Sequence, residues 1–144
     1  MIEMNELQNE AFLEKLREGK VVQFAPMGIS MTPFIRGGQD KVLVRKEETV
    51  GVGDIVLVVY RNNLILHRVY VINGSRLTLM GDGNLQGTEE VGMSEVLGTV
   101  VQIIKLGGRC CKPRKAWLWR HALPLRRYLL KIDRKWNKYI RKQQ

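Results

Sequence analysis

The residue pair in this sequence best suited to covalent chemistry is a serine and a histidine. Ser30 lies in the stretch Gly28-Ile29-Ser30-Met31-Thr32-Pro33. A glycine shortly before the serine and a proline shortly after it indicate a tight turn that presents the hydroxyl. Because a loop serine is common, Ser30 is interpreted as a nucleophile only if a base accompanies it, and otherwise as an ordinary loop residue.

His67 is the candidate base. It falls in the apolar run LILHRVYVI at 64–72, whose alternation places His67 on one face of a strand with Ile65, Val69 and Val71. Such a histidine is often a core residue with a satisfied ring, and this interpretation stays open. Partial burial also favours the neutral imidazole, which is the form that accepts a proton from a serine hydroxyl.

A third segment, Gly81-Asp82-Gly83-Asn84, follows the end of another apolar run. Aspartate and asparagine tolerate a left-handed backbone, so the segment is typical of a hairpin turn. It also offers Asp82 as an acid that orients the His67 ring. The two interpretations are both compatible with the sequence.

Strands are the elements that would position these residues. Six runs rich in β-branched and aliphatic residues, separated by glycine, asparagine and aspartate, are predicted to be strands. They are 20–24, 41–45, 54–60, 64–72, 76–80 and 96–106. Short polar segments at 61–63 and 73–75 have the composition of hairpin turns, which predicts antiparallel pairing.

The fold predicted from these elements is mainly β. The β-domain occupies 20–106, and a short helix precedes it within 1–19, where apolar residues recur at helical spacing and Gly19 would end the helix. The whole chain has 144 residues, which suits one domain and a tail rather than a multidomain enzyme.

The positive charge of the chain is concentrated at one end. The formal net charge is +10, yet residues 1–104 hold 10 Lys/Arg and 13 Asp/Glu, whereas residues 105–144 hold 14 Lys/Arg and a single acid, Asp133. The composition changes after Gly107 and Gly108 to a mixture of basic, aliphatic and aromatic residues. Residues 109–144 are therefore predicted to form a separate basic amphipathic helical tail.

Seven residues of the tail recur at steps of four and three and would line one face of a helix. They are Leu118, Ala122, Leu125, Leu129, Ile132, Trp136 and Tyr139. Pro124 would kink this helix or begin a second one. The apolar stripe would pack on the β-domain or lie on an anionic membrane surface. Nucleic acid is disfavoured as a partner, because the stripe has no evident use on a phosphate backbone and no recognition motif is present.

Several further classes of protein are disfavoured. The N-terminal MIEMNELQNE is acidic and lacks the pattern of a secretory signal, and the longest apolar run, IVLVVY at 55–60, is too short to span a membrane. The only two cysteines, Cys110 and Cys111, are adjacent and suit neither a useful disulfide nor a zinc site. We therefore expect a cytoplasmic protein without metal or other cofactor, with peripheral attachment to the inner face of the membrane as an option.

Taken in order, three segments resemble the signal peptidase I and LexA-type group of serine peptidases. They are GISMTP at 28–33, LHRV at 66–69 and GDGN at 81–84. The stretches DKVLV at 40–44 and GDIV at 53–56 also stand where that group has a first strand and the start of the next. The resemblance covers about 22–104, and the ordered set is more specific than any one segment.

The resemblance implies a LexA and signal peptidase type of fold and an acyl-enzyme mechanism. Most bacterial members use a lysine as the base, whereas the endoplasmic-reticulum type has a histidine at the matching place. Residues 54–81 contain no lysine, so the resemblance implies Ser30 as nucleophile and His67 as general base. It implies Asp82 as the first choice for the orienting acid, with Glu89 or Glu90 as the second.

The residues around Ser30 would bind substrate and stabilise the oxyanion. They are Gly28, Ile29, Met31 and Pro33. Several bacterial signal peptidases have a hydroxyl side chain where this chain has Gly28, so the resemblance leaves the oxyanion mainly to backbone donors, above all the Ser30 N–H.

The expected function is removal of a leader or propeptide from a small protein or peptide that binds as an extended strand. A membrane-spanning signal peptidase is disfavoured by the lack of an apolar span, and a self-cleaving repressor by the lack of an Ala-Gly or Cys-Gly bond. The alternative is a non-catalytic peptide-binding or membrane-adaptor module on the same scaffold. The sequence does not specify the oligomeric state.

Overall fold

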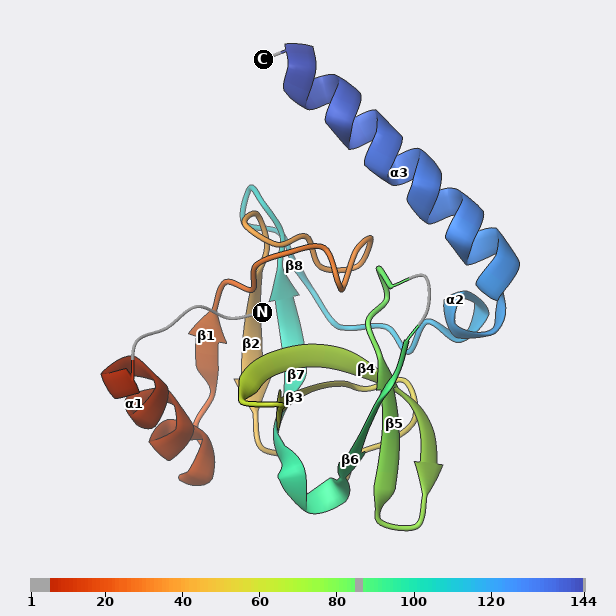
Figure 1. Cartoon of the computed structure of the whole chain (residues 1–144). Helices are drawn as coiled ribbons and strands as arrows, with labels where there is room; N and C mark the ends of the chain where they lie inside the picture. Colours follow the sequence, from red (N-terminus) through yellow and green to blue (C-terminus); the bar gives the residue numbers. More distant parts are fainter. Residues whose placement is uncertain (1–5, 85–86, 144) are drawn as a thin grey trace.

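One curled antiparallel sheet forms the body of the molecule, with a short helix before it and two helices after it (Figure 1). The structure is a computed structural model and describes residues 6–84 and 87–143. The strands are Val22–Phe24 (β1), Lys41–Arg45 (β2), Ile55–Tyr60 (β3), Asn63–Asn73 (β4), Arg76–Met80 (β5), Glu89–Gly92 (β6), Val96–Ile104 (β7) and Cys110–Cys111 (β8). The helices are Glu6–Arg17 (α1), Trp117–His121 (α2) and Leu123–Gln143 (α3), and Met93–Glu95 is a short 3₁₀ turn.

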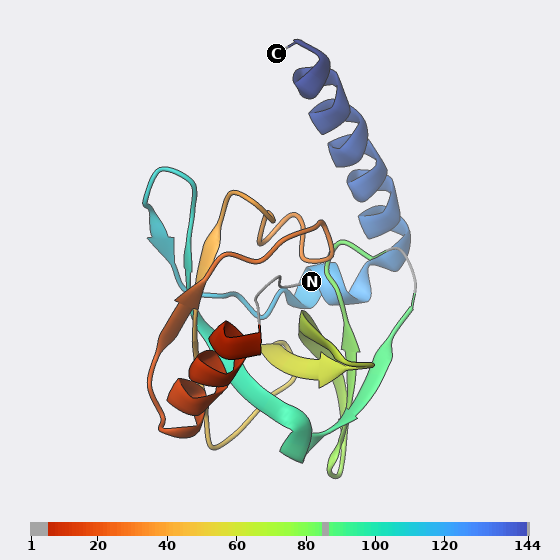
Figure 2. The same ribbon diagram turned by 60° about the vertical axis from the view of Figure 1, so that its left-hand side comes forward.

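The strands lie in the order β1-β2-β7-β3-β4-β5-β6, and β8 pairs with β7. Every described pair is antiparallel. The register shifts between Leu43 and Val44, between Leu57 and Val58, and between Val69 and Val71. Such bulges increase the local twist of a strand, so they help the sheet to curl around its core (Figure 2).

Two tight hairpins join the strands that surround the candidate site. Tyr60 pairs with Asn63, and the two residues between them, Arg61 and Asn62, have positive φ values of 49° and 65°. This is the conformation that a two-residue hairpin turn requires. Gly74, in the turn between β4 and β5, also has a positive φ of 60°. The antiparallel pairing expected from these polar segments is confirmed.

Alternating side chains of the sheet fill two apolar clusters, one on each face. The first cluster includes Val42, Val44, Leu57 and Leu66, and the α1 side chains Phe12 and Leu16 pack into it. The second consists of the buried residues Val56, Val58, Val69, Leu77, Leu79 and Val91. Because β3 and β4 contribute to both clusters, their central residues are buried on both sides.

The predicted short helix and the six predicted strands are confirmed in their general positions. Two strands were not predicted. β6 has the sequence EEVG, in which only Val91 is buried, and β8 consists of two cysteines that pair with Ile103 and Ile104. Such short segments have too few alternating residues to give a strand pattern. The sheet therefore extends past Leu106 into the segment predicted as tail, and helix begins only at Trp117.

The tail forms two helices rather than one kinked helix. Pro124 lies in the first turn of α3, where its missing N–H costs no intrahelical hydrogen bond. The interpretation that the apolar stripe packs on the β-domain is wrong for its α3 part, because Leu125, Leu129, Ile132 and Trp136 are all exposed. Ala122 is half-buried, and the side chain of Leu118 lies outside the described part of the chain. The stripe faces solvent since α3 contacts the domain through a different, polar face. No helix within residues 6–84 and 87–143 is long and apolar enough to cross a membrane.

Candidate active site

Ser30 lies in the long loop between β1 and β2, which is folded into tight turns. The amide of Thr32 donates to the Ile29 carbonyl, and the Ile35 amide donates to the Met31 carbonyl at 2.9 Å. A Cβ on Gly37 would lie 2.1 Å from the Gly28 oxygen, so the loop closes on itself only with glycine at this position. The turn expected around Ser30 is therefore present.

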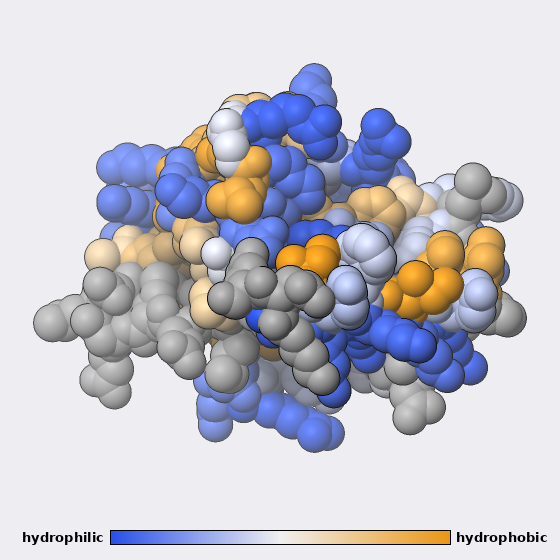
Figure 3. Space-filling model, turned by 90° about the horizontal axis from the view of Figure 1, so that it is seen from above, coloured by the Kyte–Doolittle hydropathy of each residue, from blue (hydrophilic) through white to orange (hydrophobic). Residues whose placement is uncertain are grey.

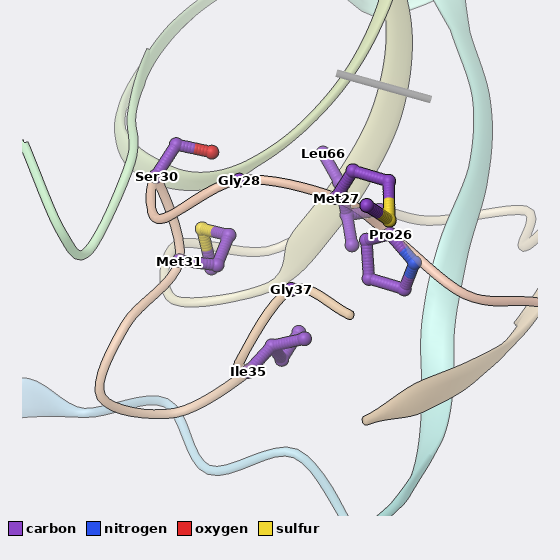
Figure 4. A pocket seen from close by; sticks show the side chains of 8 residues that line it. All are labelled: Pro26, Met27, Gly28, Ser30, Met31, Ile35, Gly37 and Leu66. Carbon is purple, nitrogen blue, oxygen red and sulfur yellow. The ribbon is translucent and has the colours of Figure 1, made fainter. Parts of the chain in front are cut away.

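The side chains beside Ser30 fall into two groups. Met31 and Ile35 are buried in the first apolar cluster and hold the loop to the sheet. Figure 4 shows the Ser30 hydroxyl on the opposite side of the loop from these two side chains. The cavity that is lined by Ser30, Met31 and Ile35, among other residues, has a volume of about 10 Å³, roughly the space of one water molecule. Of the predicted substrate-binding residues, Gly28 and Ile29 are exposed and Pro33 is half-buried, whereas the Met31 side chain belongs to the core.

His67 lies in the middle of β4, and its ring is buried. Its Nδ1 is 2.9 Å from Oε2 of Glu89, the first residue of β6. The pairing of Leu79 with Glu89 places β6 beside β5, and β5 in turn pairs with β4. The sheet register therefore brings this carboxylate across one intervening strand to the histidine.

The other ring nitrogen of His67 faces the serine loop. A Cβ on Gly81 would lie 3.0 Å from His67 Nε2 and 2.4 Å from the Ser30 carbonyl oxygen. Gly83 is equally constrained, since a Cβ there would lie 2.0 Å from the Ile29 oxygen. The Gly83 amide also donates to the Ser30 carbonyl at 2.8 Å. The two glycines thus allow the loop at 81–84 to pack directly on the backbone of Ser30, next to the imidazole.

Ser30 and His67 are brought into one site without a direct bond. Among the contacts of residues 6–84 and 87–143, none joins Ser30 Oγ to His67 Nε2. Catalytic hydrogen bonds are often long before substrate binds. The His67 ring and the Ser30 carbonyl both lie against Gly81, which places the imidazole next to the backbone of the candidate nucleophile.

Asp82 does not pair with His67, contrary to the first choice made from the sequence. Its carboxylate accepts from Arg68 Nε at 2.8 Å and from Arg68 Nη2 at 2.7 Å, and both side chains are fully buried. Burial raises the pKa of the Asp82 carboxyl, and the hydrogen bonds from Arg68 act in the opposite direction. Arg68 follows His67 in β4, so the two side chains project from opposite faces of the strand. Asp82 lies on the face of Arg68 and therefore does not reach Nδ1 of His67. The second choice, Glu89, makes that contact, whereas Glu90 is exposed.

The tail holds the backbone of the 81–84 loop, a feature that sequence reasoning missed. Arg126 Nη2 donates to the carbonyls of Gly81 and Asn84 at 2.7 and 2.8 Å. Trp119 Nε1 donates to the Asp82 carbonyl at 3.1 Å, and Arg134 Nη2 donates to that of Gly83 at 2.5 Å. All four carbonyls of the loop therefore accept hydrogen bonds from tail side chains. Nothing in the sequence distinguishes these two arginines from the other cations of the tail.

A groove of about 570 Å³ separates the serine loop from α3. On one side it is lined by Gly28, Ile29, Thr32, Arg36, Gly37 and Gln39, and on the other by Asp133, Arg134, Asn137, Lys138, Ile140 and Arg141. Arg36 and Asp133 are joined by an ion pair at 2.8 Å. Gly28 and Ile29 immediately precede Ser30 in the chain, so one wall of the groove is formed by the serine loop, although Ser30 itself lines the small cavity instead.

Within the part of the chain that the structure describes, no three His, Cys, Asp or Glu side chains gather closely enough to hold a metal ion. No protein-family model matches the sequence, and no curated protein is a significant match to it.

Proposed function

We propose that this chain is a serine peptidase of the signal peptidase and LexA type. The proposal rests chiefly on one observation: His67 has Glu89 on Nδ1, and its Nε2 lies against Gly81, which also touches the backbone of Ser30. The mainly antiparallel sheet, the resemblance of the ordered segments and the groove beside Ser30 support the same fold and function.

Glu89 is the residue that orients the base. A carboxylate that accepts the Nδ1–H of His67 favours the tautomer whose lone pair is on Nε2. That lone pair is then directed toward the serine loop. Glu89 also stabilises the imidazolium that forms when His67 takes a proton. Asp82 has a different role: paired with Arg68, it supports the loop that packs on Ser30.

The reaction proceeds through an acyl-enzyme. Ser30 Oγ bonds to the scissile carbonyl carbon while its proton passes to His67 Nε2, and the resulting oxyanion accepts a hydrogen bond from the Ser30 N–H. The carbon–nitrogen bond then breaks as Nε2 returns the proton to the leaving amine. Water, activated by the same nitrogen, attacks the ester and releases Ser30 with the new carboxyl terminus.

The proposed substrate is a leader or propeptide bound in extended form, with small residues before the cut. The groove of about 570 Å³ that starts at Gly28 and Ile29 is large enough for several residues of such a peptide. Because exposed Ile29 precedes Ser30, it offers an apolar contact next to the scissile bond.

A fluorophosphonate probe tests the nucleophile without knowledge of the substrate. An activated serine forms an Oγ–phosphorus bond with the probe, fluoride leaves, and the proton is taken up by the base. The chain has only three serines, so Ser75→Ala and Ser94→Ala are matched controls for Ser30→Ala. We expect intact mass spectrometry to show one phosphonyl group on the wild type and on both controls, and none on Ser30→Ala or His67→Gln.

Labelling that persists in Ser30→Ala would overturn the assignment of the nucleophile. If the wild type is not labelled and cleaves no peptide from a library with small residues before the cut, the peptidase proposal fails. The non-catalytic peptide-binding module would then be favoured, provided that the wild type and Ser30→Ala bind library peptides equally well.

The orienting acid is tested by comparing Glu89→Gln with Glu90→Gln. The two residues are neighbours in β6, but only Glu89 contacts His67. Loss of an orienting carboxylate reduces the rate by about 10⁴-fold in serine–histidine enzymes. We expect such a loss of labelling rate for Glu89→Gln and none for Glu90→Gln. Equal rates in the two variants would remove Glu89 from the mechanism.

A further inference from the structure

The helix α3 contacts the β-domain through a face that is largely polar. Arg126 is 0% exposed, and its guanidinium also bonds to the hydroxyl of Tyr70. Asp133 pairs with Arg36, and Arg134 reaches the Gly83 carbonyl. The one apolar side chain of α3 that is fully covered is Leu130, among the side chains that the structure describes. The orientation of α3 is therefore set by polar contacts.

The apolar face of α3 is left uncovered. The apolar stripe of this helix consists of Leu125, Leu129, Ile132, Trp136 and Tyr139, whose side chains are 42% to 61% exposed. Surface helices of globular proteins usually bury this face and expose the polar one. Seen from above, where α3 lies uppermost, the molecule shows orange apolar groups beside blue polar groups (Figure 3). An exposed row of apolar side chains of this kind indicates an interaction surface.

A row of lysines borders the apolar stripe. Lys131, Lys135 and Lys138 are exposed, and none of them forms an ion pair with another described residue. Lys138 also borders the groove beside the serine loop, so it lies where the cationic face meets the domain-facing side. Lys135 comes three residues after Ile132 and four before Tyr139, so it is their neighbour on the helix surface. Ile132, Lys135, Trp136 and Tyr139 line one shallow hollow of about 300 Å³. The helix thus has an apolar face and a cationic face side by side, in addition to the face that contacts the domain.

We propose that α3 binds the surface of an anionic lipid bilayer through the apolar stripe. Leucine and isoleucine side chains would enter the boundary between headgroups and acyl chains, with the rings of Trp136 and Tyr139 at the headgroup level. The three lysines would extend their ammonium groups to the lipid phosphates. Arg126 and Arg134 join this helix to the loop at 81–84, so the bound helix keeps the Ser30 site next to the bilayer.

A second copy of the chain is a weaker fit to the same surface. The spacing of the stripe would suit a coiled coil, but coiled coils use charges of opposite sign beside the apolar seam. The only acid in residues 105–144 is Asp133, and Arg36 already pairs with it. Two copies of α3 would therefore bring like charges together, whereas anionic headgroups complement the lysines.

Vesicle co-sedimentation of the full chain tests the proposal. We use vesicles of phosphatidylcholine alone and of phosphatidylcholine mixed with phosphatidylglycerol. The wild type is expected to bind the mixed vesicles more tightly, and added salt should weaken that binding. Each lysine near an anionic surface contributes roughly fivefold to binding. The variant Lys131→Gln/Lys135→Gln/Lys138→Gln should therefore bind about 100-fold more weakly.

The variant Leu129→Ser/Ile132→Ser/Trp136→Ser removes the centre of the stripe and should bind at least about 100-fold more weakly. All three positions are exposed, so the urea midpoint of this variant should match that of the wild type. Leu106→Ser is the matched control, because Leu106 is also exposed but lies outside α3. Ser30→Ala should bind vesicles like the wild type, which separates this result from the outcome for the peptidase.

Vesicle binding that is equal in the wild type and in the stripe variant would overturn the proposal. So would a failure of the wild type to bind the mixed vesicles. Sedimentation of the wild type as a dimer that the stripe variant abolishes would assign the surface to a second copy instead. Binding to duplex DNA but not to vesicles would assign the basic face to nucleic acid.

Discussion

The sheet and α3 bury opposite kinds of side chain: the sheet buries apolar residues, whereas α3 buries an arginine and exposes most of its apolar residues. In the sheet, residues such as Val56 and Leu57 are fully buried, and apolar burial of this kind is the main favourable term in folding. In α3, Arg126 is fully buried while Leu129 and Trp136 are exposed. Hydrogen bonds to backbone carbonyls can therefore decide which face of a helix is covered, because a buried guanidinium is tolerated only where acceptors surround it.

The two fully buried arginines extend this comparison. Arg68, within the sheet, is paired with the carboxylate of Asp82, whereas Arg126 bonds to two carbonyls and to the Tyr70 hydroxyl. The positive charge of Arg126 also acts to lower the pKa of Asp82. Both arginines therefore stabilise the loop at 81–84. Arg68 binds the Asp82 side chain of the loop, and Arg126 binds backbone carbonyls of the loop.

The largest expected effect is that of Arg68→Met. This substitution leaves the Asp82 carboxylate buried without its partner, and breaking such a pair costs about 3–5 kcal/mol of the free energy of unfolding. Urea denaturation measures the loss, with Arg76→Met as a control because Arg76 is exposed on β5. The double variant Arg68→Met/Asp82→Leu should recover part of the stability. A loss below about 1 kcal/mol for Arg68→Met would show that the ion pair does not support the sheet.

The next largest loss of stability is expected for Leu130→Ala, and the neighbouring variant Leu129→Ala serves as the comparison. Leu130 is 1% exposed and Leu129 is 42% exposed. Leu130→Ala should cost about 2–3 kcal/mol, in the lower part of the range for buried leucine, because α3 contacts the domain on one side only. Leu129→Ala should change stability by less than about 0.5 kcal/mol. If thermal or urea unfolding showed the larger loss for Leu129→Ala, the orientation of α3 described above would be wrong.

A smaller effect is expected for Arg134→Met. This change removes the donor to the Gly83 carbonyl but keeps the aliphatic part of the side chain. A single hydrogen bond of this kind contributes about 1 kcal/mol. Hydrogen exchange should become faster in α3 and at the Gly83 amide, whereas the amides of β3 should exchange as in the wild type. Arg141→Met, at the end of the same groove, is the control.

The smallest effect is a dependence of stability on pH in the β-domain. Burial acts to raise the pKa of Asp40, but hydrogen bonds from Lys105 and from the Arg36 and Leu106 amides outweigh it and lower the pKa. The folded state therefore favours the charged carboxylate. Its contribution is present above the pKa of an unfolded aspartate, about 4, and is lost as the pH falls through the lower folded value.

Asp40→Asn removes this titration. The melting temperature of the wild type should therefore fall more between about pH 5 and pH 3 than that of Asp40→Asn. At neutral pH the variant should be the less stable of the two, because Lys105 loses its carboxylate partner. Parallel melting curves for the two proteins over this pH range would contradict the role given to Asp40.

Much of the fold was predictable because its determinants are local. Alternating apolar residues and short polar turns such as Arg61-Asn62 indicate strands and hairpins without knowledge of the rest of the chain. The same holds for the helical spacing of the tail. The turn around Ser30 and the placement of His67 in a strand were also predictable, since both depend on neighbouring residues alone.

Six of the strands, the helical pattern of the tail, and the candidate serine and histidine can thus be predicted from the residues alone, whereas β6 and β8 cannot. The contact of Glu89 rather than Asp82 with the His67 ring could not be predicted in this way, because it depends on the register of β6 on β5 and on the face of β4 from which each side chain projects. The side of α3 that is buried likewise depends on contacts between distant parts of the chain. The helical pattern shows two faces, but the carbonyls at 81–84 that select the arginine face come together with the tail only in the folded chain.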